Sequence, residues 1–165
     1  MRARHGVRFP WVSLVTVFGV QGLVMWVVAL PLQARQDAPL TWHAWSLVGI
    51  GLWSIGFCFE TVGDLQLARF KSLSENQGKV MDRGFGRLSR HPNYFGNALV
   101  WSGLAAIAQD EMDRSWALIS PVVMTFFRLR VSGVRLLERT LTSRKAGYQD
   151  YIQRTSSFFP WPPRS

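Results

Sequence analysis

The chain has 165 residues, of which 48% are hydrophobic, and its 19 Lys and Arg outnumber its 10 Asp and Glu to give a formal net charge of +9. This length suits one domain rather than two. A nucleic-acid-binding protein spreads its basic residues over a soluble surface, whereas here they lie in segments that alternate with apolar ones. The composition therefore argues against nucleic acid as a partner.

Four runs without charged residues follow one another along the chain, at 9–34, 38–59, 91–109 and 115–127. About 20 apolar residues cross a bilayer as a helix, so the first two runs are long enough. The third is close to that limit, and the fourth reaches it if the side chains of Arg128 and Arg130 extend toward the headgroups. We predict an all-α integral membrane protein, one domain over residues 1–165, with about four transmembrane helices. Their expected spans are about 10–32, 42–60, 93–109 and 115–132.

The first run has an alternative interpretation as the core of a secretory signal peptide, because Arg2, Arg4 and Arg8 precede it. It is too long for that role, and the following VVALPLQARQ is a poor cleavage site. The single cysteine, Cys58, lies in the second run, so no intramolecular disulfide can form, and we expect a buried packing residue there.

The distribution of basic residues predicts the orientation. The first ten residues contain three, the 61–90 segment six and the tail from residue 128 eight, whereas the connections 35–43 and 110–114 contain one each. With four spans, all the basic segments fall on one side of the membrane. Cytoplasmic loops are the ones enriched in Lys and Arg, so both termini and the 61–90 segment are predicted to be cytoplasmic, in an inner membrane.

The cytoplasmic segments have their own expected structure. Polar residues between 59 and 73 indicate that the second helix continues beyond the membrane, and Gly78 marks a turn. Pro92 suits the first turn of a helix, so the third span should begin at or just after His91. Leu136, Leu137 and Leu141 predict a carboxy-terminal amphipathic helix.

The last residues continue this pattern. Gly147 marks a second turn, and Tyr148, Tyr151 and Ile152 predict a second short helix. The FFPWPP stretch cannot form a long helix, because prolines interrupt it. Its aromatic residues predict a place at the membrane interface.

Polar side chains gather at the cytoplasmic ends of several predicted spans. They come from Asp64 and Lys71, from 90–94, and from 138–151. Arg and Lys neutralise phosphate, and Asn and Tyr orient a ligand by hydrogen bonds, so this composition suits a phosphate-bearing ligand in cytoplasmic loops. The alternative is contact with anionic lipid headgroups, which we prefer for the isolated Lys79, Arg83 and Arg87.

His91 is interpreted as a residue that packs or hydrogen-bonds within its loop. A metal site would need further ligands, and His5, His43 and Cys58 lie at different predicted depths, so we expect no metal. The sequence contains no G-x-S-x-G, P-loop or G-x-G-x-x-G pattern. Soluble hydrolase, nucleotide-hydrolysis and Rossmann functions therefore lack support.

Three blocks in this order, FETVGDLQLARFK, SRHPNYFGNALVWSGLA and LLERTL…GYQDYIQRTSSFFPWPP, resemble the bacterial membrane family DUF1295 over essentially the whole chain. That family is related to the steroid 5-alpha-reductases and sterol C14-reductases, and more distantly to isoprenylcysteine carboxyl methyltransferases. The resemblance implies NADPH-dependent reduction of an activated carbon–carbon double bond in a lipid-like enone.

Matching the blocks position by position implies roles for individual residues. Asp64 would contact the adenosine or ribose part of NADPH, Lys71 its phosphate, and Asn93 the nicotinamide side. The remaining matched positions are Arg90, His91, Tyr94, Glu138, Tyr148 and Tyr151. The resemblance identifies no catalytic acid, and Tyr94 is the one candidate to test.

The chain departs from the family pattern in two ways. Asn97 stands where the family usually has Glu, which implies a lost carboxylate contact. Relatives are also longer at the amino end, so the chain resembles the cofactor half and is expected to be a truncated gene product, the result of a misplaced start, or a chain that needs a partner. The expected partners are further copies of the chain or a protein that supplies amino-terminal helices. Two alternatives stay open: a membrane methyltransferase using S-adenosylmethionine, since those enzymes also carry an RHPxYxG block, and a non-catalytic membrane protein.

Overall fold

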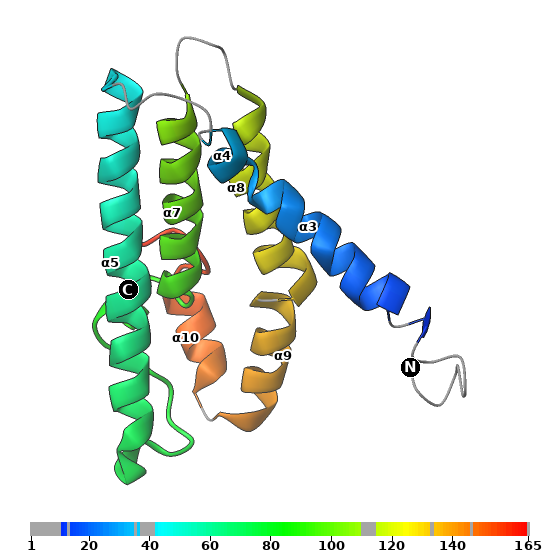
Figure 1. Ribbon diagram of the computed structural model, residues 1–165. Coiled ribbons are helices and arrows are strands. Elements are labelled where there is room, and N and C mark those ends of the chain that lie inside the picture. The colour runs from blue at the N-terminus through cyan, green and yellow to red at the C-terminus, as the bar shows by residue number, and fades with distance from the viewer. Residues whose placement is uncertain are drawn as a thin grey trace.

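The computed structural model describes residues 11–12, 14–34, 36, 42–109, 115–132, 134–145 and 147–164 (Figure 1). Within these residues the structure is helical and contains no strand. The first ten residues, most of the 35–43 connection and the 110–114 connection, which enter the charge argument above, lie outside the described residues. In chain order the elements are the π-helix Leu14–Gly19, α3 (Val20–Val28), α4 (Leu30–Ala34), α5 (Ala44–Ser72), the 3-10 helix Ser74–Asn76, α6 (Phe85–Leu88), α7 (Pro92–Ala108), the 3-10 helix Ser115–Leu118, α8 (Ile119–Phe126), the π-helix Phe127–Ser132, α9 (Val134–Arg144) and α10 (Tyr148–Arg154).

Glycine backbone forms the contact between α5 and α7, which run side by side in Figure 1. Gly49 and Gly56 face Gly103 and Gly96, with a spacing of seven residues on each helix. A Cβ atom added to Gly56 would lie 2.6 Å from the carbonyl oxygen of Gly96, and one added to Gly96 would lie 2.5 Å from that of Gly56. Because only glycine lacks Cβ, this close approach requires glycine at both positions.

α5 is the one described helix that is long and apolar enough to cross a membrane, and the 14–28 stretch is a shorter apolar helix. Large apolar side chains on α5 and α8 are exposed, among them Trp45, Leu47, Phe57, Val122 and Phe126. α5 starts two residues after the expected second span does and continues to Ser72, which confirms the expected extension. The four-span membrane arrangement stays a prediction.

The first apolar run does not form one continuous helix. A turn at Ala29 separates α3 from α4, and Figure 1 shows α3 diverging from the other helices. Pro31, which is fully buried, lacks the amide hydrogen that would continue the helical hydrogen bonds. The buried hydroxyl of Ser120 instead donates to the Val28 carbonyl oxygen at 2.6 Å, which ties the end of α3 to α8.

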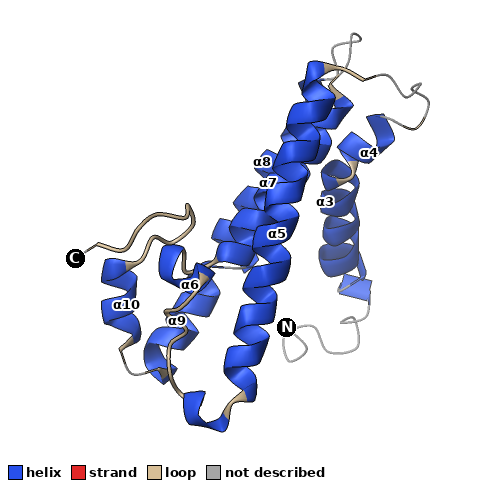
Figure 2. Cartoon of the chain, turned by 90° about the vertical axis from the view of Figure 1, so that its left-hand side faces the viewer, coloured by secondary structure: helices blue, strands red, loops and turns tan. Residues whose placement is uncertain are grey.

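Turns and short helices lie at the polar end of the α5–α7 pair. Gly78 and Gly147 have positive φ angles, as the predicted turns require, and Pro92 occupies the first turn of α7. α9 and α10 confirm the two helices expected after residue 134, whereas Cys58 is exposed rather than buried, so that expectation was wrong. Figure 2 shows α6, α9, α10 and the carboxy-terminal tail (residues 155–164) gathered at this end of the molecule.

Candidate functional site

A cavity of about 160 Å³ lies where α5 and α7 meet the 80–91 segment, α9 and α10. Eight of the nine predicted site residues line it: Asp64, Lys71, Arg90, His91, Asn93, Tyr94, Tyr148 and Tyr151. The ninth, Glu138, contacts two of them, Arg90 and His91. The structure therefore brings together polar residues that are up to 87 positions apart, between 64 and 151.

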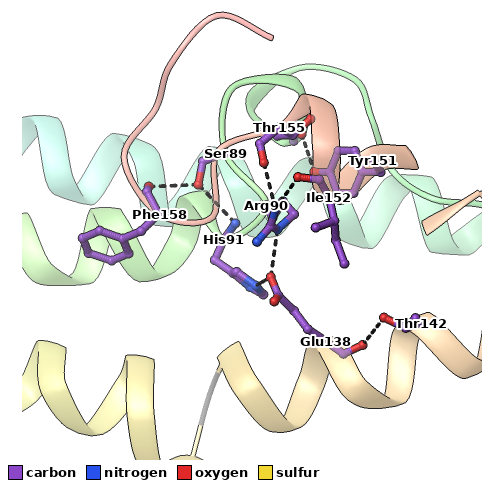
Figure 3. A network of polar contacts seen from close by, with 10 residues as sticks. Ser89, Arg90, His91, Glu138, Thr142, Tyr151, Ile152, Thr155 and Phe158 are labelled. Atoms are coloured by element: carbon purple, nitrogen blue, oxygen red, sulfur yellow. Dashed lines mark hydrogen bonds and ion pairs between the residues drawn. The ribbon is translucent and has the colours of Figure 1, made fainter. Parts of the chain in front are cut away.

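Arg90 joins three segments of the chain (Figure 3). Its Nε donates to Glu138 Oε1 on α9 at 2.8 Å, and its Nη1 donates to the carbonyl oxygens of Ile152 at 2.8 Å and Thr155 at 2.9 Å. Its backbone amide also donates to the Ser156 carbonyl oxygen at 2.9 Å. Because most of its donors are used within the protein, Arg90 mainly positions the loop, α9, α10 and the tail around the cavity.

His91 shares the carboxylate of Glu138, with 3.2 Å between Nε2 and Oε1 (Figure 3). The imidazole is buried, and this burial lowers its pKa below 6.5 despite the opposing hydrogen bond and charge of Glu138. Its backbone amide donates to Ser89 Oγ at 3.2 Å, and that hydroxyl donates to the Phe158 carbonyl oxygen at 2.9 Å. His91 therefore hydrogen-bonds within its loop through its backbone amide, as predicted, whereas its imidazole contacts Glu138 on α9.

Tyr94 lies in the cavity wall beside His91. The two rings stack with centroids 5.3 Å apart and 12° between their planes. The guanidinium carbon of Arg128 lies 5.1 Å from the centroid of the Tyr94 ring, within the range of a cation–π contact. These contacts orient the tyrosine side chain at the edge between α7 and the residues that follow α8.

Two acid–amide pairs link α5 to α7 one helical turn apart. The side-chain amide of Asn93 donates to Asp64 Oδ1 at 3.0 Å. One turn further along, the amide of Asn97 donates to Glu60 Oε1 at 3.3 Å. Asn97 therefore pairs with a carboxylate on the neighbouring helix, and the loss of the carboxylate contact expected from the family's Glu at this position stays a prediction. Among the described side chains, the carbonyl oxygen Oδ1 of Asn97 is buried without a hydrogen-bond partner.

Two lysines face the cavity from different helices, Lys71 at the end of α5 and Lys145 just after α9. Burial lowers the pKa of Lys145, and the positive charge of Lys71 lowers it further. Lys145 Nζ donates to the Lys79 carbonyl oxygen at 2.7 Å, and within the described residues neither lysine forms an ion pair with a carboxylate. The cavity therefore has a cationic side.

Tyr148 and Tyr151 close the cavity from α10. Both are buried, and the Tyr151 hydroxyl donates to the Gly86 carbonyl oxygen. Burial raises the pKa of Tyr148 to about 12 and raises that of Tyr151 as well. Both phenols therefore stay neutral at physiological pH and act mainly as wall and support.

Glu60 and Lys145 are two polar residues of this region that were not predicted from the sequence. A signal for Glu60 was available, because Glu60 and Asp64 are four residues apart, as are Asn93 and Asn97, so each pair lies on one helix face. Lys145 lies within the polar 138–151 segment but matched no block that singled it out. Its role depends on the turn at Gly147, which folds α10 back toward the cavity.

The described residues form a helical protein with an apolar helix of membrane-spanning length and, at one end, a cavity with two lysines in its wall. A sequence profile described as "Protein of unknown function (DUF1295)" matches residues 1–155, so the chain belongs to the DUF1295 family. It is 31% identical over 120 residues to the cobalt-zinc-cadmium resistance protein CzcN of Cupriavidus metallidurans, an alignment that covers 73% of this chain. The chain spans about half of that relative, 52% of its length. No solved structure matches.

Proposed function

We propose that this chain is, or forms part of, a membrane reductase that uses NADPH to reduce a carbon–carbon double bond in a lipid-like enone. The observation that carries the proposal is the pair Lys71 and Lys145, which face one cavity together with Asp64, Asn93 and Tyr94. Burial and the positive charge of Lys71 lower the pKa of Lys145, and an anion that enters the cavity would favour the protonated form of Lys145 again. A phosphate group is such an anion.

The residues around the cavity fit a phosphate-bearing dinucleotide. Lys71 and Lys145 would hold phosphate, the Asp64 carboxylate would accept from ribose hydroxyls, and Asn93 would hydrogen-bond the nicotinamide side. A bound NADPH would supply the hydride for reduction. The cavity volume of about 160 Å³ is smaller than the roughly 300–1,000 Å³ of typical ligand pockets. We therefore expect it to take the phosphate-bearing part of the cofactor, with the remainder on the adjoining surface.

The proposed location is a bacterial inner membrane crossed by about four helices, with the cavity and both termini on the cytoplasmic side. Exposed apolar side chains on α5 and α8 support contact with lipid, because soluble proteins rarely expose so many large apolar groups. A cavity beyond the polar ends of α5 and α7 would let a water-soluble cofactor meet a lipid-soluble substrate. Tyr94 is the candidate to polarise the substrate carbonyl, because it lines the cavity at that level.

A methyltransferase that uses S-adenosylmethionine is the second candidate. The RHPNYFG block at 90–96 favours it, since the isoprenylcysteine methyltransferases that the sequence resembles carry a similar block. The two lysines weigh against it, because S-adenosylmethionine has no phosphate and carries a sulfonium cation. The relative CzcN is named for cobalt, zinc and cadmium resistance, but the described residues hold no group of three His, Cys, Asp or Glu side chains placed for a metal ion.

Ligand-induced thermal stabilisation tests the proposal, because a ligand that binds the native state raises its stability. In purified protein, NADPH should raise the unfolding midpoint, and S-adenosylmethionine should not. The double variant Lys71→Gln/Lys145→Gln should lose most of the NADPH effect, as should Asp64→Ala and Asn93→Ala. The matched control is Arg69→Gln/Arg144→Gln, which removes two exposed charges outside the cavity wall. Stabilisation by the methyl donor alone would overturn the proposal.

A further inference from the structure

A second hollow, separate from the cavity above, lies between the 82–87 segment, the end of α10 and the carboxy-terminal tail. Its volume is about 680 Å³. Four exposed arginines from three segments line this arginine hollow: Arg83, Arg87, Arg154 and Arg164. Asp82 is the one acid in its wall, and no ion pair involves these arginines within the part of the chain that the structure describes. Such an arrangement concentrates positive charge around an open space.

The backbone holds these arginines in place. The amide of Trp161 donates to the Leu88 carbonyl oxygen at 3.0 Å, and the amide of Arg164 donates to the Arg154 carbonyl oxygen at 2.9 Å. In Figure 2 the tail runs from α10 past α6 and ends away from the helix bundle. Because both ends of the tail are fastened, the backbone positions of Arg154 and Arg164 beside α6 are fixed.

Aromatic contacts connect this tail to the apolar helices. Phe158 and Phe159 contact Phe95 on α7, with ring centroids 5.8 and 6.0 Å apart, and Phe95 contacts Phe59 on α5 at 5.3 Å. Phe159 and Trp161 nevertheless expose 68% and 69% of their surface. Exposed aromatic side chains beside basic ones, at the level where apolar helices end, are typical of a membrane interface.

We propose that the arginine hollow binds the phosphate of an anionic phospholipid, while Phe159 and Trp161 insert between the adjoining lipids. Arginine recognises phosphate through paired hydrogen bonds, and anionic lipids concentrate on the cytoplasmic leaflet. The hollow lies outside the wall of the proposed cofactor cavity, so this inference does not depend on the reductase proposal. The proposal assigns a specific lipid-binding site to the tail, in place of a general attraction between basic residues and anionic headgroups.

The test measures lipid binding to purified protein in detergent, with the rise in the unfolding midpoint as the readout. Phosphatidylglycerol should raise the midpoint, whereas phosphatidylcholine should not. The double variant Arg87→Gln/Arg154→Gln should bind phosphatidylglycerol roughly tenfold or more weakly. Its matched control, Arg69→Gln/Arg144→Gln, removes the same charge outside the hollow and should change affinity less than about twofold. Trp161→Ala should weaken phosphatidylglycerol binding with all four arginines present.

Several outcomes would overturn the proposal. Equal losses in the two double variants would indicate general charge attraction. An equal response to inorganic phosphate at the same concentration would indicate a free-phosphate site, and an equal response to phosphatidylcholine would indicate no headgroup recognition. If Arg87→Gln/Arg154→Gln has a lowered midpoint without lipid, Arg83→Gln/Arg164→Gln replaces it, and unchanged lipid binding by that folded variant would also contradict the assignment.

Discussion

Along α5 and α7, the first part of the contact and the last part are held together in different ways. From Gly49 to Gly56, α5 meets α7 through glycine backbone, and carbonyl oxygens lie where any side chain would start. From Glu60 onward the same two helices are joined by hydrogen bonds between carboxylates and amides, and beyond them Arg90 joins α9, α10 and the tail. The first region fixes the relative position of the two helices, and the second region carries the polar groups that are available to bind a ligand.

The largest expected effect lies in the glycine region. In Gly96→Ala, the new Cβ would lie 2.5 Å from the Gly56 carbonyl oxygen and 2.6 Å from the Glu60 amide nitrogen, and backbone cannot move away easily. We expect a loss of about 3 kcal/mol in the free energy of unfolding. Thermal unfolding in detergent measures it.

The control for this substitution is Gly51→Ala on the exposed side of α5, where an added Cβ meets nothing within 4 Å. Alanine favours helix over glycine, so this variant should be more stable by about 0.5–1 kcal/mol. Opposite signs for the two variants support the close helix contact. Equal effects would contradict it.

The polar region should respond next most strongly, through Glu138→Gln. This change leaves the Arg90 guanidinium, whose side chain is 9% exposed, without its carboxylate. Because Glu138 itself is 20% exposed, we expect a loss of about 2 kcal/mol rather than the larger cost of a fully buried pair. The exposed Glu75→Gln should change stability by less than about 0.5 kcal/mol. Chemical denaturation compares them, and equal results would show that the Arg90 network contributes little.

His91 gives the polar region a pH dependence that the glycine region lacks. Its folded pKa lies below the ordinary 6.5, so the unfolded chain takes up a proton more readily. The stability contributed by neutral His91 is therefore present above about pH 6.5 and is lost as the pH falls below it. Unfolding midpoints measured from pH 7.5 to pH 5 should fall less steeply in His91→Gln than in the wild type. An equal slope in His91→Gln and the wild type would contradict this assignment.

The smallest effect is expected at the border between the regions, in Glu60→Gln. A glutamine here can donate to the unpartnered Oδ1 of Asn97 and accept from its amide, so both buried groups are satisfied. We expect stability to rise by about 1 kcal/mol. A loss in the same unfolding assay would show that the Glu60 carboxylate has a partner of its own.

Much of this architecture could be predicted from composition and from a few proline and glycine residues that mark helix starts and turns. Pro92, Gly78 and Gly147 each occupy the helix start or turn that their backbone preferences indicate. The polar residues of the cavity could be predicted as a group, because charged and amide side chains beside long apolar runs lie at the same ends of the helices. Turns, helix starts and polar helix ends depend on residues that are close together in the sequence, so the sequence alone predicts them.

Other features depend on how the helices pack against one another, and a single sequence does not predict that packing. The break at Ala29 depends on Pro31 and on the hydroxyl of Ser120, which is 92 positions from the carbonyl it caps. Glu60 meets Asn97 because the glycine contacts set the relative positions of α5 and α7. The contacts by which Arg90 joins α9, α10 and the tail could not be predicted from the sequence, and its expected place in cofactor binding stays a prediction.

The most direct test of the central proposal is calorimetry of NADPH binding at about pH 9.5, below the ordinary lysine pKa, in buffers with different ionisation enthalpies. The pKa of Lys145 is lowered in the free protein, and a phosphate beside it should raise that pKa again. Binding should therefore be accompanied by proton uptake, and Lys145→Gln should lose that uptake, whereas Arg144→Gln should keep it. Absence of NADPH binding, or binding with the same proton uptake in Lys145→Gln, would contradict the assignment of this cavity to a phosphate-bearing cofactor.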